Sequence, residues 1–286
     1  KAYNDLQGFN LDFAGFTVHS VLVDGADAVY ERDGRELRVT PATILKQDEI
    51  FEVAVSYSGI PGKGVTNFYD VFAGGWTRHR NGVYVASEPD GSALWFPVND
   101  HPLDKATYTF QITVPDKYVV AANGQLKNVD DHDDPTTTYI WEASDEMASY
   151  LATVNIGDFV AETAEGPDGL PIRHYFPADK VDDLKLTFAP FADMIAFYNT
   201  LIGPYPFEAA GAVVADTDLS FALETQTMIL FGSSIGTRST EAEIVIAHEL
   251  VHQWFGNSVS LAQWKDIWLN EGFATYVSML WLEHAR

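Results

Sequence analysis

Hydrophobic and polar residues alternate along the first part of the chain as they do in half-buried β-strands. Phe51–Tyr57 shows this period of two most clearly. Similar short apolar runs are separated by dipeptides that favour tight turns, namely Asp24-Gly25, Asp33-Gly34, Asn81-Gly82 and Asn123-Gly124. Up to about residue 160 the pattern therefore predicts β structure in a sandwich or saddle, with hairpins at the last three dipeptides.

One acidic segment, Asp130–Pro135, interrupts this β pattern and raises the question of a calcium loop. It lacks the Asp-x-Asp-x-Asp-Gly spacing that calcium-binding loops use. We therefore expect it to be the exposed tip of a hairpin.

The pattern changes after about residue 175, where apolar residues recur at helical spacing. A single helix is predicted from Asp182 to Ile202, ended by Gly203-Pro204. Its apolar stripe, expected in the core, comprises Leu184, Leu186, Phe188, Phe191, Met194, Ile195 and Tyr198. Two apolar runs, Gly211–Ala215 and Thr227–Phe231, predict strands. Residues 1–175 are thus expected to form a β-rich domain and residues 176–286 the first part of an α/β domain.

A second helix is predicted to begin at Thr240, since Thr at the N-cap with Glu243 three residues later has the form of a capping box. The helix should run to about Phe255, where Gly256-Asn257 ends it. His248 and His252 lie four residues apart within it, hence on one face, with Cβ atoms about 5–6 Å apart.

This spacing allows two imidazoles to bind one zinc ion. Glu249 is displaced by roughly 100° around the helix, close enough to take a proton from a metal-bound water. A catalytic zinc needs a third protein ligand, and Glu271 follows His252 after eighteen intervening residues. We therefore predict one Zn²⁺ held by His248, His252 and Glu271, with Glu249 as the catalytic carboxylate. Asp266 and Asn270 are candidates to orient these ligands, or to stabilise the fold.

Composition limits the possible partners. The net charge of -24 disfavours nucleic acid and anionic membranes, because phosphates would be repelled. The chain has no cysteine, so a metal site must use His and carboxylate ligands. No segment approaches the roughly 20 apolar residues of a membrane span. Acidity and the absence of cysteine favour an exported or extracellular location over the cytoplasm, and the oligomeric state stays open.

His248-Glu249-x-x-His252, with Glu271 in a Trp-Leu-Asn-Glu-Gly-Phe-Ala run, resembles the aminopeptidase N family of gluzincin metallopeptidases. His252–Asn257 is similar to the family's His-Gln-Trp-Phe-Gly-Asn segment. The resemblance implies a mostly-β saddle domain followed by the first part of a thermolysin-like catalytic domain. It also implies a zinc aminopeptidase acting on peptides with a free N-terminus.

The resemblance further implies substrate-binding residues. Phe221–Thr225 is similar to the family's Gly-Ala-Met-Glu-Asn motif, in which the glutamate, here Glu224, binds the substrate α-amino group. Ala222 and Leu223 would lie beside it in the substrate site. Glu88, before Pro89, would reach the same amine. The family's oxyanion-stabilising tyrosine lies beyond the zinc-ligand glutamate and has no counterpart here, so the 286-residue chain itself is expected to be inactive.

Two alternatives stay open at this point. The family includes a member that opens a lipid epoxide with the same zinc site, although nothing specific in this sequence favours that substrate. The chain would otherwise be a non-catalytic binding module with a structural zinc site. Retention of Glu249 argues against that module, because a purely structural site does not need it.

Overall fold

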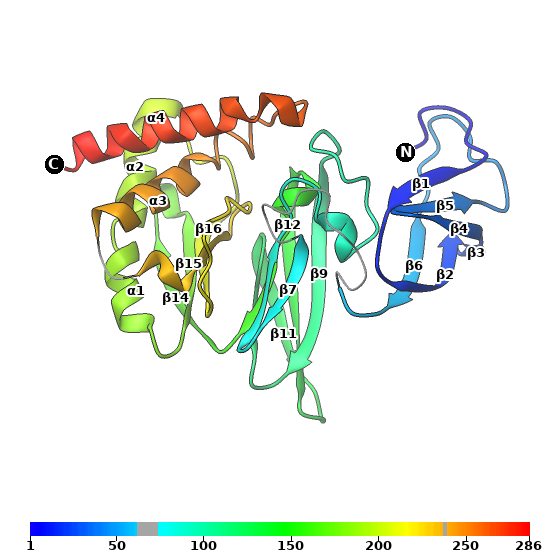
Figure 1. Cartoon of the computed structure of the whole chain (residues 1–286), viewed down its shortest axis with the longest axis horizontal. Helices are drawn as coiled ribbons and strands as arrows, with labels where there is room; N and C mark the ends of the chain where they lie inside the picture. The colour runs from blue at the N-terminus through cyan, green and yellow to red at the C-terminus, as the bar shows by residue number, and fades with distance from the viewer. Residues whose placement is uncertain (62–73, 237–238) are drawn as a thin grey trace. The chain divides into compact units, whose positions relative to one another are not determined.

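The computed structural model describes residues 1–61, 74–236 and 239–286. The chain separates into two compact units. The first unit comprises residues 1–77 and 87–101, and the second comprises residues 78–86 and 102–286. Figure 1 shows the helices and strands along the chain.

The first unit is built from two three-stranded sheets, ordered β1-β5-β4 and β3-β2-β6. The strands are β1 (Phe9–Asp12), β2 (Thr17–Val23), β3 (Ala26–Asp27), β4 (Val29–Asp33), β5 (Glu36–Thr40) and β6 (Val53–Ser58). Apolar residues of both sheets share one core, formed by Phe13, Val21, Val23, Leu37, Val39 and Leu45. The hairpin predicted at Asp33-Gly34 is confirmed, since Asp33 pairs with Glu36 across it.

Two further sheets contain the strands between residues 75 and 157. One has the order β10-β13-β8-β7 and the other β11-β12-β9. The strands are β7 (Gly75–His79), β8 (Gly82–Ala86), β9 (Ala106–Pro115), β10 (Val119–Ala122), β11 (Gln125–Asp131), β12 (Thr136–Met147) and β13 (Val154–Gly157). The acidic segment Asp130–Pro135 joins the paired strands β11 and β12, which confirms the predicted hairpin tip. The hairpin at Asn81-Gly82 is also confirmed, because it joins the neighbouring strands β7 and β8.

The hairpin predicted at Asn123-Gly124 is wrong. This dipeptide joins β10 to β11, which belong to different sheets. Gly124 has a φ of 78°, and a Cβ atom there would lie 1.9 Å from the carbonyl oxygen of Glu142. Glycine is therefore required for the chain to cross between sheets, and not for a two-residue turn.

The remaining sheet has the order β14-β15-β16-β17 and supports four α-helices. β14 (Phe159–Glu165) pairs antiparallel with β15 (Pro171–Pro177), whereas β16 (Ala210–Ala215) and β17 (Ile229–Gly232) extend the sheet in parallel. Strands on both sides of residue 175 thus share one sheet, and the domain division at 175/176 stays a prediction. The helices are α1 (Val181–Phe188), α2 (Phe191–Ile202), α3 (Thr240–Val251) and α4 (Trp268–His284).

The single helix predicted over Asp182–Ile202 is wrong, because two helices, α1 and α2, occupy this segment. Pro190 lies between them, where its ring and its missing N–H prevent a continuous helix. Of the predicted apolar stripe, all but one residue is buried. Leu186 is exposed, because it is two residues from both Leu184 and Phe188 and therefore lies on another face of the helix.

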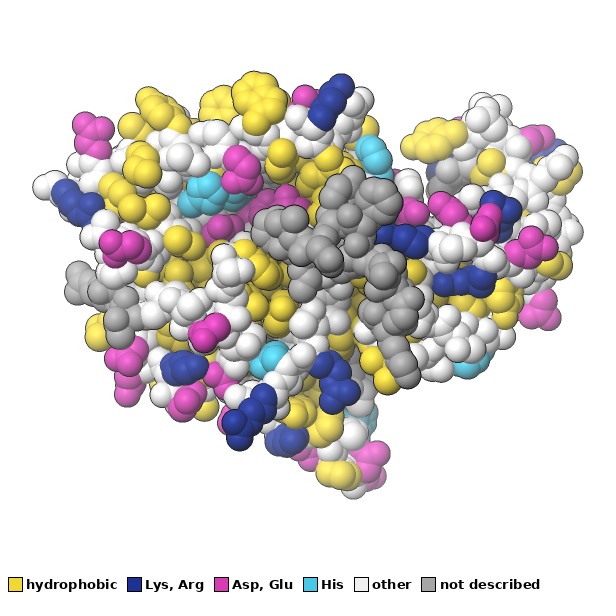
Figure 2. Space-filling view, in the orientation of Figure 1, with side chains coloured by type: hydrophobic (Ala, Val, Ile, Leu, Met, Phe, Trp, Pro, Cys, Tyr) yellow, Lys and Arg dark blue, Asp and Glu magenta, His cyan; other side chains and the backbone are white. Residues whose placement is uncertain are grey.

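Helix α3 lies against α1, α2 and α4. Its N-cap is Ser239, whose Oγ accepts a hydrogen bond from the backbone N–H of Ala242 at 3.1 Å. The prediction of Thr240 as the cap is therefore wrong by one residue. Helix α4 runs along the outer side of this layer, and hydrophobic side chains gather along the same edge of the molecule (Figures 1 and 2). Among the described residues, no helix combines the length and apolarity needed to cross a membrane.

Candidate metal centre

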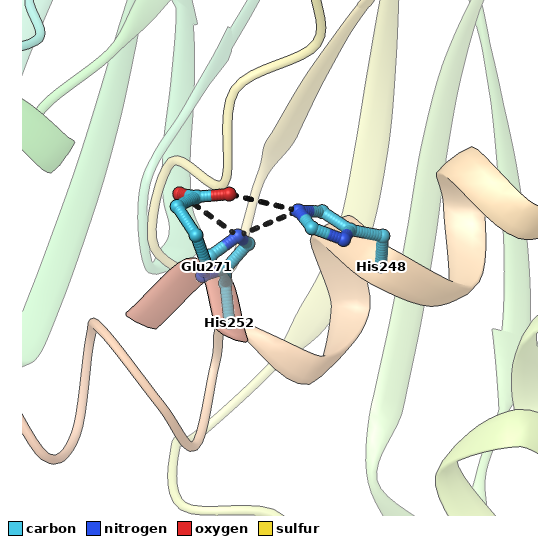
Figure 3. A group of neighbouring side chains, drawn as sticks. All are labelled: His248, His252 and Glu271. Atoms are coloured by element: carbon cyan, nitrogen blue, oxygen red, sulfur yellow. Dashed lines mark hydrogen bonds and ion pairs between the residues drawn. The ribbon is translucent and has the colours of Figure 1, made fainter. Parts of the chain in front are cut away.

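Three predicted zinc ligands converge in the second unit (Figure 3). Helix α3 places His248 and His252 on one face, and their Nε2 atoms are 3.1 Å apart. Glu271, in the first turn of α4, points at both rings. Its Oε2 lies 3.2 Å from Nε2 of His248, and its Oε1 lies 3.6 Å from Nε2 of His252. The predicted ligands are thus brought together from two helices.

The spacing of these donor atoms fits zinc. A tetrahedral zinc site with ligand bonds of about 2.0–2.1 Å has edges of about 3.3 Å between donor atoms. The three separations of 3.1, 3.2 and 3.6 Å lie close to that value. Two nitrogens and a carboxylate form one face of the tetrahedron and leave a fourth position for water or substrate, as a catalytic site requires.

The two histidines differ in their surroundings. The His252 side chain is 2% exposed, whereas that of His248 is 22% exposed. Nδ1 of His252 lies 3.0 Å from the carbonyl oxygen of Phe255. A proton on Nδ1 shared with this carbonyl leaves the Nε2 lone pair free for a metal. This partner was not predictable from the sequence, because a main-chain carbonyl has no signature in the sequence.

Glu271 is the most exposed of the three ligands, with 48% of its side chain accessible. Its hydrogen bond with His248 lowers its carboxyl pKa, while partial burial acts in the opposite direction. Asn270 is buried, and Asp266 ends the short 3-10 helix at Trp264–Asp266. An orienting role for either residue stays a prediction.

Two buried glutamates lie next to the histidine pair. Glu224 is 3% exposed and Glu249 is 8% exposed. One carboxylate oxygen of Glu224, one of Glu249 and a ring nitrogen of His252 form a single group. These three atoms all lie within 4.8 Å of one another. Oε1 of Glu224 is buried and has no hydrogen-bond partner among the described residues. The site therefore combines a metal-ligand set with two desolvated carboxylates.

A narrow loop carries Glu224. Leu223 and Leu230 form an isolated antiparallel bridge with two backbone hydrogen bonds of 2.9 Å. Leu223 is buried in this bridge, and Ala222 lies with Phe221 and Val245 in the wall of a shallow apolar pocket. The substrate-binding roles of Ala222, Leu223 and Glu224 remain predictions.

Glu88 belongs to the first unit, where it directly precedes a cis proline, Pro89. Glu224 lies in the second unit, and the binding of the substrate amine by Glu88 stays a prediction.

The α/β layer presents a ligand set of two histidines and one glutamate, the kind that catalytic zinc sites use. The sequence-family model for the peptidase M1 N-terminal domain matches residues 11–151. The sequence-family model for the peptidase family M1 domain matches residues 192–286. The chain belongs to peptidase family M1. The predicted family, fold class and zinc cofactor are thereby confirmed.

Several relatives are aminopeptidases by name. Glutamyl aminopeptidase from Sus scrofa is 31% identical over 210 residues, which cover 70% of this chain and 22% of the relative. Glutamyl aminopeptidase from Homo sapiens is 28% identical over 269 residues, covering 88% of this chain and 27% of the relative. The chain therefore spans about a quarter of the length of these curated relatives.

Solved structures agree with the fold. An M1 zinc metallopeptidase from Deinococcus radiodurans superimposes with a TM-score of 0.87 at 28% identity. The match covers 99% of this chain and 64% of that protein. A mutant of the same protein was solved bound to a Tyr-Ser-Ala substrate.

Proposed function

We propose that the protein carrying this chain is a zinc-dependent aminopeptidase that releases N-terminal residues from peptides. One observation carries the proposal: the zinc ligand set adjoins two buried carboxylates, Glu224 and Glu249. The aminopeptidase names of the relatives support the same activity.

The mechanism assigns a role to each residue. His248, His252 and Glu271 would hold a zinc ion, which when bound would polarise a carbonyl and lower the pKa of a water. Glu249 accepts the proton of the attacking water on its carboxylate and then returns it to the leaving amine. Its position on α3, next to His248, keeps it close to the metal without requiring it to be a ligand.

Glu224 makes the proposed activity an exopeptidase activity. One oxygen of this buried carboxylate, Oε1, has no hydrogen-bond partner among the described residues. Such an oxygen is costly, because it has lost its hydration without gaining a compensating interaction. A substrate ammonium supplies both a positive charge and hydrogen-bond donors. Binding the ammonium at Glu224 places the first peptide bond, and no later one, at the metal.

The test compares hydrolysis of an L-amino acid 4-nitroanilide with that of its N-acetylated form, in the whole protein that carries this chain. We expect cleavage of the free-amine compound only. Glu249→Gln should lower kcat by about 10²–10⁴-fold, the usual contribution of a general base, while zinc content is unchanged. Equal cleavage of the acetylated compound, or full activity of the Glu249→Gln variant, would contradict the proposal.

The proposed partners are peptides with a free N-terminus. The expected export of the protein remains a prediction based on its acidity and its lack of cysteine.

A further inference from the structure

The backbone of Glu224 is held by the chain segment that follows the zinc helix. Nε2 of Gln253 donates a hydrogen bond to the Glu224 carbonyl oxygen at 3.0 Å, and Nδ2 of Asn257 donates to the same oxygen at 2.7 Å. Gln253 and Asn257 are both fully buried. Two side-chain amides thus converge on one carbonyl, and it belongs to the residue proposed to bind the substrate amine.

Gln253 also holds the other end of the Glu224 loop. Its Oε1 accepts a hydrogen bond from the backbone N–H of Thr227 at 2.9 Å. Thr227 has a φ of 63°, a conformation that a β-branched residue rarely adopts. Gln253 directly follows the zinc ligand His252 in the chain. One side chain therefore fixes the loop at both ends, one residue away from a metal ligand.

Asn257 is anchored in turn. Its carbonyl oxygen accepts hydrogen bonds from Nζ of Lys105 at 2.7 Å and from Oγ of Ser260 at 2.9 Å. Burial lowers the pKa of the Lys105 amine, while Glu146 raises it. These bonds hold the Asn257 backbone in place while its side chain reaches Glu224.

The loop has separate contacts that maintain its shape. Nδ2 of Asn123 donates to the Gln226 carbonyl at 2.7 Å, and the backbone N–H of Gly124 donates to Oγ1 of Thr227 at 2.7 Å. The bridge between Leu223 and Leu230 closes the loop. These bonds hold the loop from its other side. The side-chain amides of Gln253 and Asn257 therefore have a separate effect, because they set the position of Glu224 relative to the metal ligands.

We propose that Gln253 and Asn257 are positioning residues that fix the distance between the amine-binding carboxylate of Glu224 and the zinc ion. The proposal rests on the proposed aminopeptidase function. Neither residue touches the substrate. Each acts through the Glu224 main chain, so its loss should weaken recognition of the amine while leaving metal binding intact.

The expected loss of amine recognition in the Gln253 and Asn257 variants follows from geometry. A displacement of about 1 Å in a positioned group can lower its contribution by about a hundredfold. The loop keeps its other contacts, so we expect a smaller shift and a partial loss of amine recognition.

The experiment uses two ligands that differ only in the amine: L-leucine hydroxamate and 4-methylpentanehydroxamate. Both hydroxamates bind zinc, so the ratio of their Kd values isolates the contribution of the amine. Calorimetry on the zinc-loaded protein gives this ratio for the parent, Gln253→Met, Asn257→Asp and Glu224→Gln. Asn155→Asp is the matched control, since Asn155 is buried and donates to Oγ1 of Thr153, outside the Glu224 loop.

We expect the parent to prefer the amine-bearing ligand by about 10–100-fold, the usual range for hydrogen bonds to charged groups. Glu224→Gln should abolish the preference. Gln253→Met and Asn257→Asp should each reduce it about five- to tenfold, with zinc content unchanged, and Asn155→Asp should preserve it. Gln253→Asn and Asn257→Ser serve as replacements if the first variants do not fold.

The outcomes separate this inference from the proposed function. A preference abolished by Glu224→Gln but unchanged by the Gln253 and Asn257 variants would overturn the positioning role and leave the aminopeptidase proposal intact. Loss of zinc from those variants would also overturn it, because it would show that they support the metal site itself. A preference that survives Glu224→Gln would overturn the amine-binding role of Glu224 and, with it, the inference.

Discussion

Helices α3 and α4 supply ligands to the same metal centre, but they are held in very different ways. Helix α3 is embedded in the core, with Ile246, Ala247, Leu250 and Val251 fully buried. The beginning of α4 is open, and Glu271 is 48% exposed. The histidine half of the site is thus formed by packing, whereas the carboxylate half has fewer contacts to fix it.

The exposed side chains of α4 extend this contrast along the helix. Large apolar side chains of α4 reach the surface, namely Trp268, Leu269, Phe273, Tyr276 and Met279 (Figure 2). Buried residues such as Ala274 and Trp281 attach the opposite face to the core. In α4 the metal itself should therefore contribute more to fixing its ligand than it does in α3.

The largest expected effect comes from removing the negative charge at α4. Glu271→Gln keeps the size of the side chain but removes the negative charge that Glu271 offers to a zinc ion. Loss of a residue that only hydrogen-bonds to a metal ligand typically lowers metal affinity about 10–100-fold. Because Glu271 is itself a predicted ligand, we expect zinc affinity to fall at least that much. Competition with a fluorescent zinc chelator measures the affinity.

The matched control is Glu283→Gln, an exposed residue near the end of the same helix, which should leave zinc affinity unchanged. Equal affinities in the parent and Glu271→Gln would show that α4 does not contribute a ligand.

The second prediction concerns the turn that supports His252. Gly256 has a φ of 129°, and a Cβ atom there would lie 3.3 Å from Nδ1 of His252 and 3.3 Å from Nδ2 of Asn270. Gly256→Ala should lower the free energy of unfolding by about 1–3 kcal/mol, because the backbone is strained and the contacts are tight. Urea unfolding with and without zinc measures the change.

Gly272→Ala is the control on α4. Gly272 is helical, and a Cβ atom added there meets nothing within 4 Å. It should stabilise the fold by roughly 0.5–1 kcal/mol. If Gly256→Ala and Gly272→Ala lowered the free energy of unfolding equally, the histidine half and the carboxylate half of the site would not differ in how tightly they are packed.

The smallest predicted effect lies at the start of α3. Ser239→Ala removes the N-cap and should cost about 1 kcal/mol of unfolding free energy without changing zinc affinity. Thr240→Ala, one residue later, should cost less, because Thr240 is not the cap. Thermal unfolding of the two variants shows which residue caps the helix. A larger loss of unfolding free energy in Thr240→Ala than in Ser239→Ala would contradict Ser239 as the N-cap.

The parts of the site that depend on local spacing were predictable. Two histidines four residues apart on a helix must share a face, and a glutamate that follows after eighteen intervening residues can return over them. Alternating strands and the Asp33-Gly34 hairpin are local in the same way. Each of these features is set by residues close together in the sequence.

Features that depend on distant partners were not predictable. Asn123-Gly124 has the sequence of a hairpin, yet Gly124 lies against Glu142 and the chain changes sheets there. The acceptors used by His252 and Gln253 are main-chain carbonyls, and any residue type can supply one. Ser239 and Thr240 are both good N-caps, so only the backbone geometry distinguishes them.

The zinc content per chain shows whether His248, His252 and Glu271 together form a zinc site. Elemental analysis after dialysis should find about one zinc per chain in the parent, as expected for a three-ligand site, and none in His248→Ala. Absence of zinc from the parent, or equal zinc in both proteins, would show that these three residues do not form a zinc site.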